Sequence, residues 1–336
     1  MSTQRAGIRT DTILLTAGLL LIAFLLGEVL LLVFAAVVLA VGLDGLSRAI
    51  SRQLAVSRNW ALLGVTLAIF TSLISVVGLS AGRLALQLQE VGAAVVDFAG
   101  LGYAWLTDIG VLPESEDGNG GLAGSLRDMS GQALGWGLSA VGAITSLIIL
   151  AVLTGFLAAN PQLYRGGAVR LVPPGKREMV QDTLSALANA LRWWFLGQLV
   201  SMTILGVTVG LGLFLLDVDL WLGIAVLTAL LTFIPFIGPL IAGVPVIAVG
   251  FAAGMQTGWI VLVGYVLIQN IEGSLIGPMI QQRAVNLAPA LLIAVQVLLS
   301  LVFGAMGLIL AAPLTIVAMV AVQKLWVEHT LGERVG

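Results

Sequence analysis

The stretch LTFIPFIGPLIAGVPVIAVG, residues 231–250, decides the fold. It is apolar enough to lie inside a lipid bilayer, yet it carries Pro235, Pro239 and Pro245 with glycines between them. Proline removes a backbone donor and clashes with the preceding helical turn, and glycine loosens the chain. Irregular backbone at membrane depth is tolerated only where protein or a water-filled cavity surrounds it. The stretch therefore predicts a helix break buried inside a membrane protein.

The composition of the whole chain agrees with a lipid environment. Of its 336 residues 59% are hydrophobic and only 10% are charged, whereas a soluble domain has about 25% charged residues. The absence of cysteine excludes thiol chemistry, disulfides and iron–sulfur clusters. The chain has no HExxH, GxSxG or P-loop motif. We therefore expect neither an enzyme nor an ATP-driven pump, and no cofactor, metal or nucleic acid as a ligand.

Long apolar runs predict the spanning helices, each of which needs about 20 residues. We predict an all-α polytopic membrane protein with about eight spanning helices plus a broken or re-entrant hairpin. The first two spans form a tight hairpin around Gly27 and Glu28. Whether residues 219–255 cross fully or turn back stays open. The candidate spans are 12–27, 29–47, 59–80, 136–159, 194–216, 219–236, 239–255, 258–276, 287–303 and 305–324.

The spans divide the chain into three regions. Residues 1–80 form an N-terminal three-span region, residues 81–135 an external segment, and residues 136–330 a C-terminal transport region. The transport region includes a cytoplasmic amphipathic helix over residues 173–193, which follows two prolines. The external segment contains a second amphipathic pattern at helical spacing, formed by Leu84, Leu88, Val91, Val95 and Phe98. That helix is expected to lie on the membrane, on another subunit or on its own domain.

Positive charges gather on one side of this arrangement. Arg5 and Arg9 precede the first span, and only Arg83 and Arg127 fall on the opposite side. Since Lys and Arg collect on the cytoplasmic face, both termini are predicted to be cytoplasmic in a bacterial inner-membrane protein. The other positive residues on that face are Arg48, Arg52, Arg58, Arg165, Arg170, Lys176, Arg177, Arg192, Arg283, Lys324 and Arg334. Beside the bilayer they would meet anionic lipid.

Polar residues stand together shortly after the broken stretch. Gln269, Asn270 and Glu272 lie in the apolar run YVLIQNIEGSLIGPMIQQR, residues 265–283. A carboxylate in a membrane segment is costly and usually faces a bundle interior or a cavity. We therefore predict Glu272 as a binding site for a proton or a cation. The alternative is a simple ion pair with a cation such as Arg283.

The predicted transport pathway combines the break with these polar residues. Helix breaks free backbone groups that can bind a solute or an ion, although glycines also let helices pack closely. A purely structural hairpin over residues 232–245 is the competing interpretation, and a bond between helices is the simpler role for Gln296. The pathway residues are Pro235, Gly238, Pro239, Gln269, Asn270, Glu272, Pro278 and Gln296.

Four stretches in the second half of the chain form a combination of motifs. They are LRWWFLGQLVSMTILGV with Gly197 and Gln198, the opening stretch with its IPxxGP pattern, QNIEGSLIGPMIQQRAVNLAPALL, and GAMGLILAAPL. In this order they resemble the AI-2E family of bacterial membrane transporters. The N-terminal half is similar to that family in the layout of its spans.

The resemblance implies a secondary transporter that works without ATP. Members of the family are associated with export of autoinducer-2, a small polar furanone-derived diol, and others with exchange of sodium or lithium for protons. The partners implied are a small polar solute or a monovalent cation and a proton, together with membrane lipid. The resemblance also implies a ring-forming homo-oligomer, with a pentamer as one form. A non-transporting scaffold or channel-like ring is the third alternative.

Overall fold

The computed structural model of the chain describes residues 26–78, 100, 107–108, 140–276 and 288–332. All regular secondary structure in these residues is helical, which confirms the predicted all-α class. Nearly all of the first predicted span, the amphipathic pattern at residues 84–98 and Pro278 lie outside the described residues.

The N-terminal helices are α2 (Gly27–Leu54), α3 (Arg58–Gly78) and α6 (Ala140–Ala159). Helix α2 begins at the predicted hairpin glycine and ends where Ala55 adopts a left-handed conformation, with φ of 54°. Small residues on α2 permit close packing. A Cβ atom added to Gly42 would lie 2.1 Å from the ring of Phe195.

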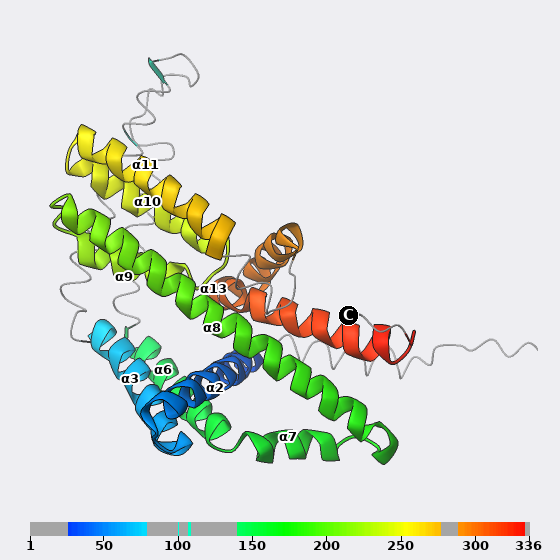
Figure 1. Cartoon of the computed structure of the whole chain (residues 1–336). Helices are drawn as coiled ribbons and strands as arrows, with labels where there is room; N and C mark the ends of the chain where they lie inside the picture. The colour runs from blue at the N-terminus through cyan, green and yellow to red at the C-terminus, as the bar shows by residue number, and fades with distance from the viewer. Residues whose placement is uncertain (1–25, 79–99, 101–106, 109–139, 277–287, 333–336) are drawn as a thin grey trace, which may run out of the picture.

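A sharp bend follows α6. The chain turns by 80° into α7 (Pro161–Arg170). Pro161 stands at the start of α7, where a missing N–H costs nothing, but it cannot continue the preceding helix. None of the residues of α7 is buried. Helix α7 therefore lies on the outside of the described bundle (Figure 1).

The longest uninterrupted helix is α8 (Arg177–Leu215), which follows the short helix η1 (Pro174–Lys176). The predicted amphipathic helix at 173–193 and the predicted span at 194–216 run together in α8 without a break. Gly206 and Gly210 serve packing instead, because a Cβ atom on Gly206 would lie 2.8 Å from that of Ala229 and one on Gly210 2.7 Å from that of Ala225. With 39 residues it is about 58 Å long, so it extends beyond a hydrocarbon core of about 30 Å.

The C-terminal part consists of α9 (Trp221–Leu231), α10 (Ile237–Ala252), α11 (Met255–Ile271), η2 (Glu272–Ile276), α13 (Pro289–Ala321) and η3 (Val322–Glu328). In Figure 1, α8 runs diagonally through the molecule, with α9, α10 and α11 along one half and α2 beside the other. Trp194 and Phe195 of α8 pack with Leu292 and Ile316 of α13 in the central core.

A kink divides α13. Gly304 has φ of 60° and ψ of −143°, which is a backbone conformation that only glycine adopts readily. The kink lies between the predicted spans 287–303 and 305–324, and Figure 1 shows the two pieces of α13 at a steep angle. A Cβ atom on Gly307 would lie 2.0 Å from the carbonyl oxygen of Leu299, so the two pieces are in close contact at the bend.

The number of spans is confirmed only in part. Helices α2, α8 and α13 are long and apolar enough to cross a membrane, and α6 with α7 makes a fourth if the bent pair is one span. Helices α9 and α10 are apolar but shorter.

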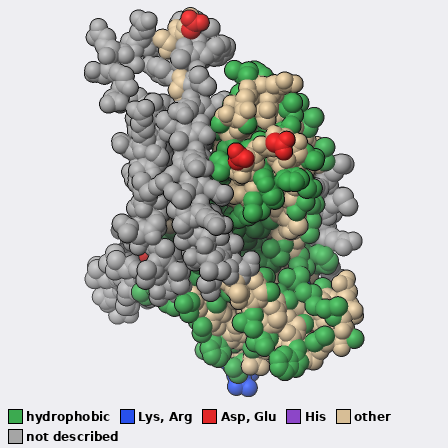
Figure 2. All heavy atoms as spheres, turned by 90° about the vertical axis from the view of Figure 1, so that its left-hand side faces the viewer, with side chains coloured by type: hydrophobic (Ala, Val, Ile, Leu, Met, Phe, Trp, Pro, Cys, Tyr) green, Lys and Arg blue, Asp and Glu red, His purple; other side chains and the backbone are tan. Residues whose placement is uncertain are grey.

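Many large apolar side chains are exposed, as on a surface that faces lipid. Figure 2 shows one such face, with acidic side chains in its upper half and Lys or Arg at the bottom.

A candidate solute site at the helix break

The break predicted from the prolines lies between α9 and α10. Helix α9 ends at Leu231 and α10 begins at Ile237, and Phe236 between them has φ of 63°. The break is shorter than the predicted hairpin at 232–245, because Pro239 and Pro245 lie within α10. Pro239 is in the first turn of the helix, where backbone N–H groups have no partner inside the helix in any case.

Side chains from three different helices donate hydrogen bonds to backbone carbonyls of this segment. The Nε2 atom of Gln198, on α8, donates to the carbonyl of Thr232. The Nε2 atom of Gln296, on α13, donates to the carbonyl of Pro235 over 2.8 Å. The hydroxyl of Tyr265, on α11, donates to the carbonyl of Pro239. Carbonyls near a break lack part of their helical bonding, so these side chains stabilise the irregular backbone.

Gly238 holds the two helices in close contact. A Cβ atom at this position would lie 1.9 Å from the carbonyl oxygen of Leu231, the last residue of α9. The obstacle is backbone and not a flexible side chain, so only glycine fits without moving one helix away from the other.

Two buried polar atoms around the segment, Oε1 of Gln296 and Oγ1 of Thr228, have no hydrogen-bond partner in the described part of the chain, and the buried Nε2 of Gln269 has only the Tyr265 hydroxyl beside it. The side chain of Gln296 is completely buried. Because a buried polar group without a partner costs about 1–3 kcal/mol, these atoms are suited to bind a polar solute or water.

The remaining predicted residues are placed less centrally. Asn270 is exposed, and its Nδ2 atom donates to the carbonyl of Val266 on its own helix. Glu272 is half-buried at the start of η2 and makes no ion pair with another described residue. It lies near the Tyr265 hydroxyl. Pro235, Gly238, Pro239, Gln269 and Gln296 are thus brought together, with Glu272 at the edge of the group.

Sequence reasoning did not assign a role to Gln198, Thr228 or Tyr265. Each is a polar side chain in an apolar helix, which is the signal that could have indicated them. Nothing in the sequence pairs them with the prolines. Among the described residues, no three His, Cys, Asp or Glu side chains come together as a metal site.

Replacing Tyr265 with phenylalanine is expected to lower the free energy of unfolding by about 1 kcal/mol, the usual value of one hydrogen bond. The ring, which packs against Gly243, is retained, so only the contacts of the hydroxyl are lost, chiefly its bond to the Pro239 carbonyl. Denaturant titration in mixed micelles measures the change. The matched control is Tyr164→Phe, on exposed α7. Equal stability of the two variants would contradict the role of the Tyr265 bond.

These features define a polytopic α-helical membrane protein with a helix break buried among its own helices. The model of the AI-2E family transporter matches residues 13–326, and the chain belongs to this family. This match confirms the resemblance found in the motifs.

Three curated relatives are similar to the chain. "Putative transport protein YueF" of Bacillus subtilis (strain 168) is 24% identical over 181 residues, which cover 52% of this chain and 49% of YueF. YrrI of the same organism, named in the same way, is 24% identical over 179 residues, covering 53% and 49%. The AI-2 transport protein TqsA of Escherichia coli (strain K12) is 35% identical over 100 residues, 28% of each chain. The chain spans about half the length of YueF and YrrI.

Proposed function

We propose that the protein is a secondary transporter that moves a small polar solute such as autoinducer-2 out of the cell. The observation that carries the proposal is the buried helix break with the unpartnered acceptor Oε1 of Gln296 and the amide of Gln269 beside the Tyr265 hydroxyl. Membership of a transporter family supports it. The printed name of TqsA, an AI-2 transport protein, supports the choice of solute.

The side-chain amides of Gln269 and Gln296 favour a neutral solute with hydroxyl groups. A hydroxyl both donates and accepts, so one hydroxyl can donate to Oε1 of Gln296 while another accepts from Nε2 of Gln269. Both side chains are uncharged, and a diol would therefore bind without the cost of burying an ion. Movement of α10 against α11 and α13 would expose the bound solute to alternate sides.

Sodium or lithium exchange for protons is the second candidate. One observation favours it: Glu272 is a half-buried carboxylate with no ion pair among the described residues, and it lies near the same tyrosine. In this mechanism Glu272 binds a cation and a proton in turn. A scaffold or channel-like ring without coupled transport is the third candidate, in which the bonds at the break serve packing alone.

We further propose a bacterial inner-membrane location with both termini in the cytoplasm, and a homo-oligomeric ring. The distribution of charge supports the orientation, while the ring rests on the resemblance to the family. Arg48, Arg165 and Arg170 belong to the basic end of the molecule, whereas the exposed Asp217 and Asp219 form the turn between α8 and α9 at the other end. Positive residues remain on the cytoplasmic side during insertion.

Efflux of autoinducer-2 from proteoliposomes containing the purified protein tests the proposal. The sharpest variant is Gln269→Leu, because it removes a polar side chain of the break that makes no hydrogen bond to the backbone of the described residues. We expect its stability to be unchanged or higher and its efflux to fall by about ten-fold or more, the value of one solute hydrogen bond in a buried site. The matched control is Gln256→Leu, at an exposed position in the first turn of α11.

The other outcomes separate the candidates. Full efflux in Gln269→Leu would contradict the proposed pathway. Cation-triggered proton movement that vanishes in Glu272→Gln, with no efflux of autoinducer-2, would establish the antiporter instead. Absence of any flux from stable, detergent-resistant oligomers would favour the scaffold.

A further inference from the structure

A second polar cluster, separate from the hydrogen bonds of the helix break, lies at the basic end of the molecule. It borders a cavity of about 680 Å³ between α2, α7 and α8. Asp44, Arg48, Arg58, Arg165 and Arg192 all line this cavity. Neither the helix break nor its hydrogen bonds involve any of them.

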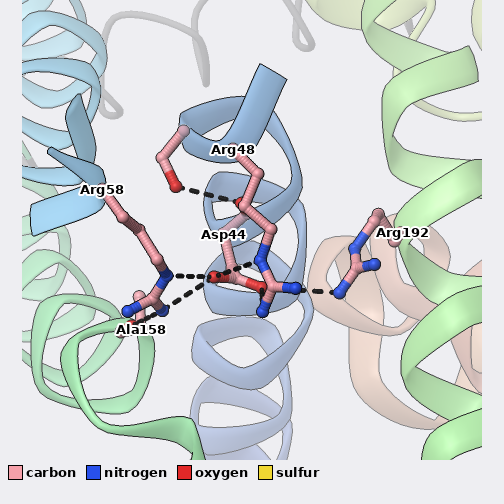
Figure 3. Close-up of polar contacts among 6 residues, drawn as sticks. Asp44, Arg48, Arg58, Ala158 and Arg192 are labelled. Carbon is pink, nitrogen blue, oxygen red and sulfur yellow. Dashed lines mark hydrogen bonds and ion pairs between the residues drawn. The ribbon is translucent and has the colours of Figure 1, made fainter. Parts of the chain in front are cut away.

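Asp44 is the centre of the cluster (Figure 3). Its side chain is buried, and its carboxylate forms ion pairs with Arg58 at 2.7 Å, Arg48 at 2.8 Å and Arg192 at 3.4 Å. Arg58 also donates to the carbonyl of Ala158, at the end of α6. Figure 3 shows the arginines approaching the carboxylate from different sides, with Arg192 reaching it from α8.

Positive charge exceeds negative charge in this cavity. Four arginines line it, while Asp44 is the only acidic residue among the described residues that do. Among the described residues, Arg165 bonds only the Ser185 hydroxyl, at 2.6 Å. Arg192 has the longest of the three ion pairs, and its buried Nε atom has no hydrogen-bond partner in the described part of the chain. Because four guanidinium groups surround one carboxylate, their mutual repulsion is only partly offset, so the cavity is suited to bind a further anion.

Apart from Asn160, Gln162 and Tyr164, the rest of the cavity is apolar. Phe34 and Val37 of α2, Leu184 and Leu187 of α8, and Val317 of α13 line it beside the arginines. A simple inorganic anion would leave this apolar surface without a partner. A ligand with an anionic group and a hydrocarbon part satisfies both halves of the cavity.

The position of helix α7 indicates that such a ligand would come from the lipid bilayer. The helix turns by 80° from α6, so it lies along the bilayer surface if α6 crosses the bilayer. Its flanking Leu171 is 88% exposed and its Leu163 is 69% exposed, as expected of an amphipathic helix at the level of the lipid headgroups. Arg165, on the same helix, would then lie at the height of the lipid phosphates.

We propose that this cavity binds an anionic phospholipid, whose phosphate is held by Arg165 and Arg192 and whose hydrocarbon chains lie against α2 and α8. Guanidinium groups form paired, charge-assisted hydrogen bonds with phosphate oxygens. The lipid phosphate would supply the arginines with negative charge beyond that of the Asp44 carboxylate. The lipid would also join α7 to α2 and α8 from the membrane side.

Native mass spectrometry of the full chain tests this, after exchange into micelles containing phosphatidylglycerol or phosphatidylcholine. We expect phosphatidylglycerol to remain bound and phosphatidylcholine to be lost. The decisive variant is Arg165→Gln, which leaves the ion pairs of Asp44 in place and should weaken retention by about ten-fold, as expected for one charge-assisted contact. The matched control is Arg170→Gln, on the same helix but outside the cavity.

A second variant and a soluble competitor complete the experiment. Arg192→Gln should weaken retention at least as much as Arg165→Gln. Equal retention of the two lipids, or equal loss in Arg165→Gln and Arg170→Gln, would overturn the proposal. Complete displacement of the lipid by millimolar glycerol phosphate would overturn the lipid assignment in favour of a soluble phosphate ester. Lipid retention is measured without transport, so this result is separable from that of the efflux assay.

Discussion

Replacing Asp44 with asparagine is expected to lower the free energy of unfolding by about 3 kcal/mol, the lower end of the range for breaking a buried ion pair. The carboxylate is buried and pairs with three arginines, which lose their common counter-charge in the variant. The lower end applies because the three arginine side chains are 28–48% exposed, so solvent screens part of their repulsion. Denaturant titration in mixed micelles measures the loss.

Two further variants make this result specific. Asp219→Asn is the matched control, because Asp219 is exposed at the turn after α8 and makes no ion pair among the described residues. Combining Asp44→Asn with Arg58→Gln should recover part of the lost stability, since one uncompensated charge is removed. If Asp44→Asn and Asp219→Asn are equally stable, Asp44 does not hold α2, α3 and α8 together.

Gly238→Ala is expected to have the largest effect at the helix break. The added methyl group would lie 1.9 Å from the carbonyl oxygen of Leu231, and neither backbone can yield without separating α9 from α10. Overpacking of this kind costs about 1–3 kcal/mol or more. We expect a clear drop in unfolding midpoint and, because the Pro235 and Pro239 carbonyls move with α10, loss of efflux in proteoliposomes.

The matched control for this variant is Gly264→Ala on α11, where no atom lies within 4 Å of the added Cβ. This change should leave stability unchanged or raise it, since alanine favours a helix by about 0.8–1 kcal/mol over glycine. Wild-type stability and efflux in Gly238→Ala would show that the close approach of α9 and α10 is not required.

Much of the fold follows from local properties of the sequence. The composition excludes an aqueous core, and apolar runs predict helices that the structure contains. Pro235 indicates the break between α9 and α10, and Gly304 lies at the predicted boundary between the last two spans. Each of these predictions needs only the residue and its neighbours, because proline and glycine act on their own turn of helix. The same local view missed the continuity of α8, whose Gly206 and Gly210 pack against α9 and do not interrupt it.

The predicted pathway shows where local reasoning ends. It indicated Gln269 and Gln296 from their polarity in apolar surroundings, and the structure brings both to the break. It could not separate Gln269 from its neighbour Asn270, which bonds its own helix at an exposed position. Local reasoning also gave Gln198 no role, because its partner Thr232 lies 34 residues away, at the end of a different helix.

The sequence by itself determined that this is a helical membrane protein, where its helices break and which stretches place it in a family. Tertiary structure alone decided which side chain supports which freed carbonyl, and that Asp44 meets Arg192 across 148 residues of chain. The reason is that a helix break arises from backbone sterics within one turn. A hydrogen bond or an ion pair instead depends on the positions of two helices, and those positions are set by the packing of the whole bundle.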